Sequence, residues 1–210
     1  MTVIDWDSLT IELIKTRLIS AYTGQVESRI PRAMLSNPPR KAAVLIPLIR
    51  DQDAWHVLFI RRTQNHRDPH SGQVAFPGGA SDATDSGPAE TALREASEEI
   101  GIDPDDVNIL GFLDDIMTIT SYRVTPVIGV MPWPYPLHLA ELEVSRAFTI
   151  PLSWLADPAN HHTQLRFLPA PYDPIPVTYF QNYDGEVLWG ASAGFLLRLL
   201  QALASGSQGE

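Results

Sequence analysis

Three glutamates, Glu95, Glu98 and Glu99, lie close together in the segment Arg94–Gly101, which reads REASEEIG. Positions i, i+3 and i+4 of a helix share one face, so a helix here would stack the three carboxylates. Like charges at this spacing weaken a helix by a few tenths of a kcal/mol, so folding alone does not favour them. Mg²⁺ prefers oxygen ligands and is held by carboxylates together with water and substrate phosphate. The spacing therefore indicates a metal-dependent enzyme that acts on a phosphate compound.

The sequence around the glutamates predicts where this helix begins and ends. Pro88 suits the first helical turn, and Gly87 or Ser86 can serve as the N-cap before it. Gly101 is a typical residue for the helix end. Apolar residues at helical spacing form the expected buried stripe: Ala92, Leu93, Ala96 and Ile100. A solvated helix whose acidic face only keeps the protein soluble is the alternative interpretation.

Together with the glycine pair before it, this helix resembles the signature of the Nudix hydrolase family. That signature is Gly-x5-Glu-x7-Arg-Glu-U-x-Glu-Glu-x-Gly-U, where U is an aliphatic residue. The matching residues are Gly79, Arg94, Glu95, Glu98, Glu99, Gly101 and Ile102. The spacing from Gly79 to Arg94 is one residue longer than the signature, and the loop glutamate is absent, with Asp82 or Asp85 as the nearest carboxylate. Ala96 also takes a position usually held by a larger aliphatic residue.

The resemblance implies a fold and a set of roles. The fold would be α/β, an α/β/α sandwich with a mixed β-sheet, preceded here by an N-terminal helix. Mg²⁺ or Mn²⁺ would be bound by the three glutamates Glu95, Glu98 and Glu99, helped by the backbone carbonyl of Gly79, where the lack of a side chain permits close approach. Arg94 is expected to orient one of these carboxylates.

The general base is open between two glutamates. Glu98 is the local candidate on the helix. Glu143, in the segment Leu139–Val144, matches a Glu-Val stretch of a subfamily and would lie in a loop that can swing over the site. A solvated acidic turn explains Glu141 and Glu143 equally well.

A second motif narrows the expected substrate. The segment Leu58–Thr63 leads through a polar loop to Gly72–Gly79, and the pair is similar to the motif that precedes the Nudix signature in coenzyme A pyrophosphatases. The intervening loop, Gln64 to Ser71, is one residue longer than in that motif. The resemblance implies hydrolysis of coenzyme A or acyl-coenzyme A to 3′,5′-ADP and (acyl)phosphopantetheine. Two alternatives stay open: an ADP-ribose, dinucleotide or nucleoside-triphosphate pyrophosphohydrolase of the same family, and a non-catalytic ligand sensor with the Nudix fold.

A concentration of cations in the same loop supports a phosphate-rich ligand. Five cationic or titratable side chains fall within ten residues: Arg61, Arg62, His66, Arg67 and His70. By contrast, the stretch from Asp82 to Asp115 has eleven acidic residues and Arg94 as its one cation. Arginine binds phosphate in bidentate fashion, so Arg61, Arg62 and Arg67, together with Gln73, are predicted to bind substrate. Ordinary surface ion pairs between these arginines and the acidic stretch are the alternative.

Composition agrees with a small-molecule enzyme. The chain has 210 residues, enough for one domain with a substantial core, and it lacks cysteine, which excludes disulfides and cysteine nucleophiles. The net charge of −10 argues against nucleic acid as a partner. No apolar stretch is long enough to span a membrane, and Asp5 and Asp7 do not suit a signal peptide, so a cytoplasmic location is expected. A homodimer is compatible with these features.

The hydrophobic pattern predicts a simple order of elements. Residues 1–39 would form an N-terminal helix, over 4–22, and a connector that pack on a hydrolase domain at 40–204, and 205–210 would be a frayed tail. Trp154 and Trp189, each with apolar neighbours, are interpreted as core residues. The expected strands are 42–50 and 55–62, joined as a hairpin, then 107–113, 123–131, 165–168 and 177–180, with a Pro-rich loop at 131–137 and a last helix at 191–204.

Overall fold

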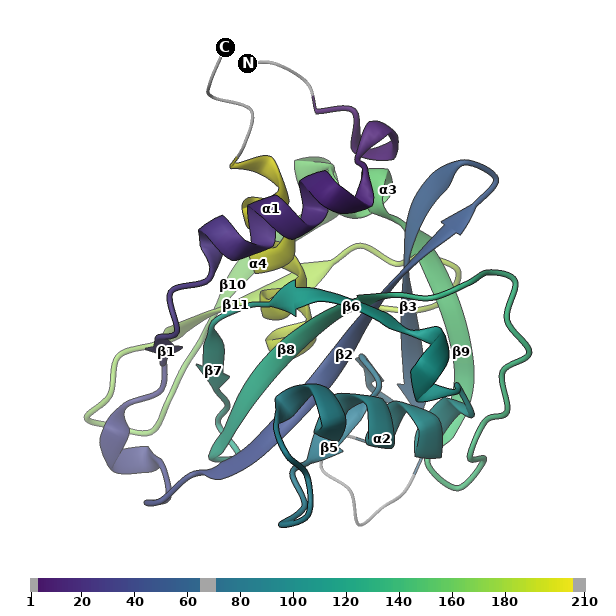
Figure 1. Cartoon of the computed structure of the whole chain (residues 1–210). Coiled ribbons are helices and arrows are strands. Elements are labelled where there is room, and N and C mark those ends of the chain that lie inside the picture. The colour runs from purple at the N-terminus through teal and green to yellow at the C-terminus, as the bar shows by residue number, and fades with distance from the viewer. Residues whose placement is uncertain (1–3, 65–70, 206–210) are drawn as a thin grey trace.

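The computed structural model describes residues 4–64 and 71–205, and it has an α/β architecture (Figure 1). The helices are α1 (Ile11–Ala21), α2 (Pro88–Ile100), α3 (Leu152–Ala156) and α4 (Gly190–Ala204), and short 3₁₀ turns lie at Trp6–Ser8, Arg32–Met34, Pro104–Asp106 and Pro158–Asn160. The strands are β1 (Val26–Glu27), β2 (Arg40–Asp51), β3 (Ala54–Arg62), β4 (Val74–Ala75), β5 (Gly78–Ala80), β6 (Asn108–Phe112), β7 (Asp115–Met117), β8 (Tyr122–Val130), β9 (Val144–Pro151), β10 (His161–Arg166) and β11 (Ile175–Phe180).

The main sheet is mixed, and its central strand is β2. Along the sheet the strands run β1-β7-β8-β2-β3-β4, while β5 pairs with β2, β6 with β8 and β9 with β3. β2 is parallel to β8 and antiparallel to β3. The predicted hairpin between β2 and β3 is confirmed, and its turn residues Gln52 and Asp53 have φ of 47° and 68°, as a tight turn of this kind requires.

Two hydrophobic cores lie on opposite faces of this sheet (Figure 1). Because strand side chains alternate, β2 sends Ile46 to one core and Leu45 to the other. The first core is covered by α1, α3 and α4, and the second by α2, through Ala92, Ala96 and Ile100. The predicted α/β/α sandwich with a mixed sheet is therefore confirmed.

The N-terminal segment is attached to the sheet and to the last helix. α1 packs against α4 and β6, and β1 pairs in parallel with β7. The helix is shorter than the pattern predicted: it begins at Ile11, because the Thr10 hydroxyl accepts a hydrogen bond from the Leu13 amide at 3.1 Å and caps it. Between α1 and β1, the Asp114 carboxylate accepts hydrogen bonds from the amides of Thr23 and Gly24, each at 2.9 Å.

Strand β9 was not predicted, and a bulge in it explains why its pattern is hard to recognise. Arg61 of β3 pairs with Arg146, but the next residue, Arg62, pairs with Val144, so Ser145 is the extra residue. As a result Val144 faces the α2 core while Phe148 faces the α1/α4 core. In a regular strand these two residues would lie on the same face, because an even number of positions separates them. The simple alternation that identifies a strand is lost at this point.

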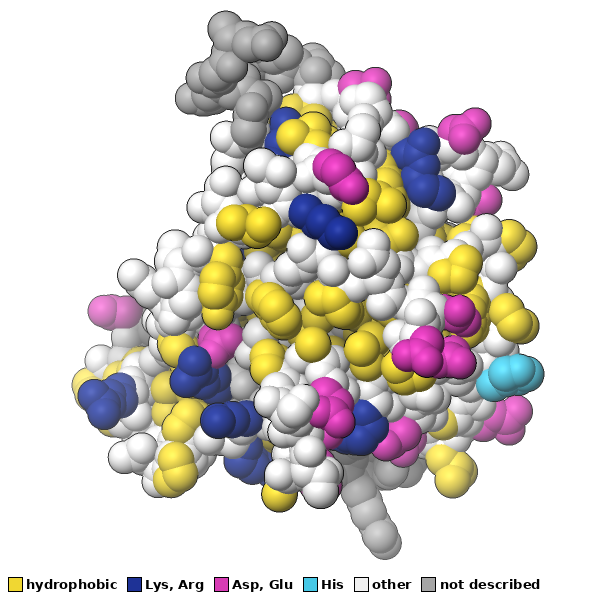
Figure 2. Space-filling model, in the orientation of Figure 1, with side chains coloured by type: hydrophobic (Ala, Val, Ile, Leu, Met, Phe, Trp, Pro, Cys, Tyr) yellow, Lys and Arg dark blue, Asp and Glu magenta, His cyan; other side chains and the backbone are white. Residues whose placement is uncertain are grey.

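The C-terminal third adds a second, two-stranded sheet of β10 and β11 before α4. The expected strand at 177–180 lies within β11, while that at 165–168 overlaps only the end of β10. In the described part of the chain no helix is long and apolar enough to cross a membrane. Figure 2 shows hydrophobic side chains on the surface between α1 and α2, with acidic side chains over α2 and the turn that follows it.

Candidate active site

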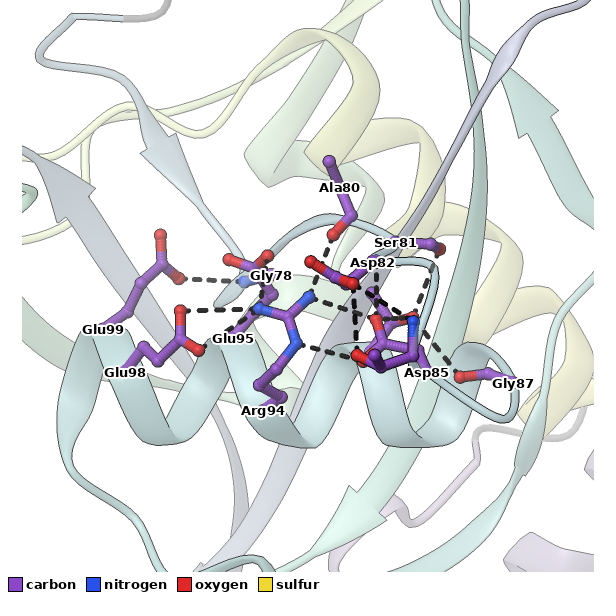
Figure 3. Close-up of polar contacts among 12 residues, drawn as sticks. Gly78, Ala80, Ser81, Asp82, Asp85, Gly87, Arg94, Glu95, Glu98 and Glu99 are labelled. Carbon is purple, nitrogen blue, oxygen red and sulfur yellow. Dashed lines mark hydrogen bonds and ion pairs between the residues drawn. The ribbon is translucent and has the colours of Figure 1, made fainter.

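The centre of the candidate site is the contact between α2 and the glycine pair Gly78–Gly79 of strand β5 (Figure 3). The predicted bounds of the helix are confirmed: Gly87 is its N-cap, and Gly101 ends it with φ of 71°. β5 is antiparallel to β2, with Gly78 opposite Val44, and α2 packs on both strands. A side chain at Gly78 would collide with the backbone of Ala43 and Val44, so this close approach requires glycine.

Glu99 is the most deeply buried carboxylate of the site. Its side chain is 2% exposed, and it accepts a hydrogen bond from the Gly78 amide at 2.9 Å. Arg62 of β3 reaches the same carboxylate at 3.4 Å. Burial raises the pKa of Glu99 to about 7, and the Gly78 amide and Arg62 only partly oppose that rise. A buried carboxylate with so little compensation is well suited to accept a cation.

Glu95 lies one turn earlier on the helix, against Gly79. A Cβ atom at Gly79 would overlap the Glu95 carboxylate, so the glycine makes room for it. Arg94 contacts Glu95 at 3.0 Å. Burial raises the pKa of Glu95, Arg94 lowers it, and the nearby charges of Glu98 and Glu143 raise it further.

Arg94 makes several of the polar contacts between α2 and the segment that precedes it (Figure 3). It donates two hydrogen bonds to Asp85, both at 3.1 Å, and one to the Ala80 carbonyl at 3.0 Å. It also forms an ion pair with Glu98 at 3.3 Å, and these carboxylates raise its pKa. Glu98 itself is 61% exposed, so of the three helical glutamates it is the most open to solvent.

Asp85 and Asp82 shape the loop in which the signature glutamate is absent. Asp85 accepts hydrogen bonds from the Thr91 hydroxyl and the Asp82 amide, each at 2.8 Å, in addition to its pairing with Arg94. These donors hold the pKa of Asp85 well below its usual range. Asp82 accepts from the Thr84 amide at 3.1 Å. The Asp82 carboxylate therefore binds the loop to itself, and the Asp85 carboxylate binds the loop to the helix.

The residues around the glycine pair Gly78–Gly79 fit a hard divalent cation, although they do not form a complete set of metal ligands. Within residues 4–64 and 71–205, no three His, Asp or Glu side chains are placed together so as to hold a metal ion. The donors are nevertheless all oxygens, the Glu95 carboxylate occupies the space that Gly79 leaves, and burial raises the pKa of both Glu95 and Glu99. A cation between them would relieve that excess of negative charge.

Glu143 lies close enough to this group to affect it. Its charge raises the pKa of both Glu95 and Glu99. The segment that carries it is fixed to α2, because the Ala140 amide donates to the Glu99 carbonyl at 2.9 Å, and to β3, because the Thr63 amide donates to the Glu143 carbonyl at 2.8 Å.

The structure separates two arginines that the sequence suggested would form one cationic patch. Arg62 points to the α2 face and contacts Glu99, whereas Arg61 points to the opposite face and contacts Glu186 at 3.3 Å. Arg67 lies outside the described residues. Gln73 lies beside Arg61 at the rim of a cleft of about 400 Å³.

Two residues that line this cleft, Glu186 and Trp189, were not selected from the sequence, nor was Arg146, which contacts Glu186. Glu186 lies in a polar turn and Arg146 lies on the unpredicted strand β9, so no motif marked either. Trp189 was interpreted as a core residue, but it is only partly buried and lines the cleft. Its ring stacks on that of Tyr179 at 5.5 Å.

Comparison with known proteins agrees with this geometry. The family model for the NUDIX domain matches residues 39–169. The Nudix hydrolase NudL of Escherichia fergusonii is 34% identical over 195 residues, which is 93% of this chain and 95% of that protein. NudL of Enterobacter sp. strain 638 is 38% identical over 161 residues, or 76% of this chain and 81% of that protein.

Solved structures show the same fold. The Nudix hydrolase RenU of M. smegmatis superimposes with a TM-score of 0.54 at 18% identity, covering 82% of this chain and 90% of that one. A MutT/nudix family protein from Enterococcus faecalis gives a TM-score of 0.50 at 17% identity, covering 84% of this chain and 70% of that one. The fold, the carboxylate helix and the family match together define a hydrolase, and this chain belongs to the Nudix hydrolase family. Within that family its sequence is similar to the NudL proteins.

Proposed function

We propose that this Nudix hydrolase cleaves the diphosphate of coenzyme A or acyl-coenzyme A, releasing 3′,5′-ADP and (acyl)phosphopantetheine. The observation that carries the proposal is that Glu95 and Glu99 both contact the glycine pair Gly78–Gly79 of β5, with Arg62 against Glu99. Arg62 belongs to the motif that resembles coenzyme A pyrophosphatases. The two halves of that motif are adjacent in the fold, since the Arg62 amide donates to the Gln73 carbonyl at 3.0 Å.

Mg²⁺ or Mn²⁺ is the proposed cofactor. Glu95, Glu98 and Glu99 would hold it, together with the backbone carbonyl of Gly79. When bound, such an ion neutralises the charge of the diphosphate and makes a water molecule more acidic. The raised pKa values of Glu95 and Glu99 support this assignment, because burial outweighs the effect of Arg94 on Glu95 and that of Arg62 on Glu99.

The chain's own residues would position the reaction and move the proton. Arg62 reaches the Glu99 carboxylate and is placed to attract the diphosphate towards the metal ligands. Arg94 holds Glu95 and Glu98 in orientation while it fixes the loop through Asp85. It donates to Asp85 and to the Ala80 carbonyl and also pairs with both glutamates, which suits an orienting residue.

Glu143 is our preferred general base, and Glu98 is the alternative. The charge of Glu143 acts on both Glu95 and Glu99, and its side chain is exposed, so it is accessible to a water molecule that enters the site from solvent. Glu98 is already engaged by Arg94. Replacing each by glutamine, with Glu141→Gln as the matched control beside Glu143, would separate them: the base variant loses kcat, by about 10²-fold or more, and the others do not.

Mass analysis of the products tests the proposed reaction. The purified protein is incubated with coenzyme A and Mg²⁺ or Mn²⁺ at mildly alkaline pH, next to Glu99→Gln and to Glu90→Gln, a control on the same helix. Release of 3′,5′-ADP by the native protein and by Glu90→Gln, but not by Glu99→Gln, supports both the substrate and the metal ligands. Cleavage of ADP-ribose, a dinucleotide or a nucleoside triphosphate in place of coenzyme A would retain the family chemistry and overturn the substrate. Loss of all turnover would favour a ligand sensor.

Two further expectations concern the protein in the cell. A homodimer and a cytoplasmic location are both proposed. Light scattering of the purified protein and fractionation of the producing cells test them directly.

A further inference from the structure

Two arginines on neighbouring strands face each other at the end of the sheet. Arg61 of β3 and Arg146 of β9 are direct partners in the antiparallel register. Like charges placed opposite each other destabilise a sheet, so packing alone does not favour the pair. Their side chains remain 37% and 38% exposed.

A carboxylate from the C-terminal segment holds both arginines. Glu186 accepts from Arg61 at 3.3 Å and from Arg146 at 3.2 Å, and its side chain is only 6% exposed. Asp184 forms a second ion pair with Arg146. The turn that carries these acids is closed by reciprocal backbone hydrogen bonds between Tyr183 and Glu186, each at 2.9 Å. The pairing fixes the guanidinium groups, but Arg61 uses one nitrogen for it, Nη1, within the described residues.

The fixed Arg61 lines a cleft that lies away from the metal-binding glutamates. The cleft has a volume of about 400 Å³, and its walls come from β3, from the Ser71–Val74 segment and from residues 185–189. Trp189 gives it an aromatic side and Gln73 an amide. Arg62, the next residue of β3, reaches Glu99 on the other face of the sheet. The cleft and the proposed diphosphate site therefore contain consecutive residues of β3, on opposite faces of the sheet.

We propose that this cleft binds the 3′-phosphate of the nucleotide end of the substrate, with Arg61 as the phosphate ligand and Glu186 as a positioning residue. The proposal rests on the proposed function, since coenzyme A carries a phosphate monoester in addition to its diphosphate. A guanidinium fork whose orientation is already fixed loses little freedom on binding a phosphate. Residues 183–189 lie beyond the matched family segment, 39–169, so this part of the chain would add specificity to a shared chemistry.

Kinetics with coenzyme A and dephospho-coenzyme A test the proposal. For the native enzyme we expect a KM about tenfold lower with coenzyme A, the size of one charge-assisted hydrogen bond. Arg61→Gln should raise KM for coenzyme A to that of dephospho-coenzyme A, while kcat with either substrate stays within about twofold. Glu186→Gln should act in the same direction by about threefold, because Arg61 keeps its charge but loses its orientation.

Two control variants guard against a purely structural effect. Arg61→Lys keeps the charge, so it should restore part of the discrimination and fold even if Glu186→Gln does not. Glu27→Gln removes an ion pair with Arg198 at a distant edge of the sheet and should leave both KM values unchanged. Equal native KM values for the two substrates, or variants that change both substrates equally, would overturn the proposal.

A binding measurement separates this inference from the proposed reaction. Calorimetry without metal should show that adenosine 3′,5′-bisphosphate binds the native protein more tightly than adenosine 5′-monophosphate, and that Arg61→Gln removes the difference. If coenzyme A is not cleaved but this preference is present, the reaction is wrong and the cleft stands. If coenzyme A is cleaved and the preference is missing, the reaction stands and the cleft assignment is wrong.

Discussion

Arg61 and Arg62 are consecutive residues of β3, and they contact buried carboxylates on opposite faces of the sheet. On the α2 face, Arg62 is the one arginine that reaches Glu99 among the described residues, and the pKa of Glu99 still rises to about 7. On the other face, Glu186 has two arginines, Arg61 and Arg146. Among the described residues, the second carboxylate therefore has more positive charge around it than the first. The comparison supports our proposal that the α2 face takes up a divalent cation, whereas on the other face the arginines are held by protein carboxylates.

Removal of divalent ions should have the largest effect and should affect the two faces differently. We expect EDTA to abolish hydrolysis, because Glu95 and Glu99 cannot bring a diphosphate close without a cation between them. Binding of adenosine 3′,5′-bisphosphate in the cleft should persist. Product analysis and calorimetry on the same EDTA-treated sample measure both. Hydrolysis that continues in EDTA, or loss of binding in the cleft in EDTA, would contradict the proposed difference between the two faces.

The substitution Glu99→Gln should have the second largest effect on activity. We expect kcat/KM to fall by about 10²- to 10³-fold, since one charged metal ligand is lost. Without metal, the thermal midpoint should stay the same or rise, because glutamine has no charge to bury. Steady-state kinetics and thermal unfolding measure the two effects, with Glu90→Gln as the control. A variant that loses activity by unfolding would contradict the assignment.

Arg62→Gln should produce a smaller change that depends on pH. Arg62 lowers the pKa of Glu99, so its removal should raise that pKa and move the acid limb of the pH–rate profile to higher pH. Activity at pH 6 should therefore fall several-fold more than activity at pH 8. Arg61→Gln, on the other face, should leave the limb in place. Coincident profiles for native protein and Arg62→Gln would show that the arginine does not act on Glu99.

The smallest expected effect is on stability. The folded pKa of Glu99, about 7, exceeds its reference value of 4.5, so the folded protein binds this proton more tightly than the unfolded chain does. The free energy of unfolding of the metal-free protein should therefore decrease as pH rises from about 4.5 to about 7, by at most about 3 kcal/mol from this group. Urea unfolding of native protein and Glu99→Gln at pH 5 and pH 8, in EDTA, isolates the contribution. An identical pH dependence for the two proteins would contradict it.

The α2 region could be predicted from sequence because its signals are local. Pro88 and Gly101 mark the helix ends, and the spacing of Glu95 and Glu99 places both on one face. The pairing of Asp85 with Arg94 could not be predicted in this way, because the loop departs from the family spacing and either Asp82 or Asp85 could have taken that place.

The second cleft depends on contacts between residues that are distant in sequence. Glu186 meets Arg61 across 125 positions, and no local pattern indicates such a contact. Strand alternation predicts that Arg61 and Arg62 point to opposite faces of the sheet, but their shared charge favoured the interpretation as one cationic patch. The bulge at Ser145 hid the strand that supplies Arg146.

The packing of α1 against α4 has a consequence for how the protein is made. Leu18 of α1 and Leu199 of α4 belong to the same buried core, and Arg17 donates a hydrogen bond to the Leu203 carbonyl. A nascent chain that has emerged only to residue 169, the end of the family match, lacks α4, so α1 can pack against β6 but not against its neighbouring helix. α1 can therefore pack against α4 only after residues 190–204 have been synthesised, and until then this part of the core is exposed to chaperones and proteases.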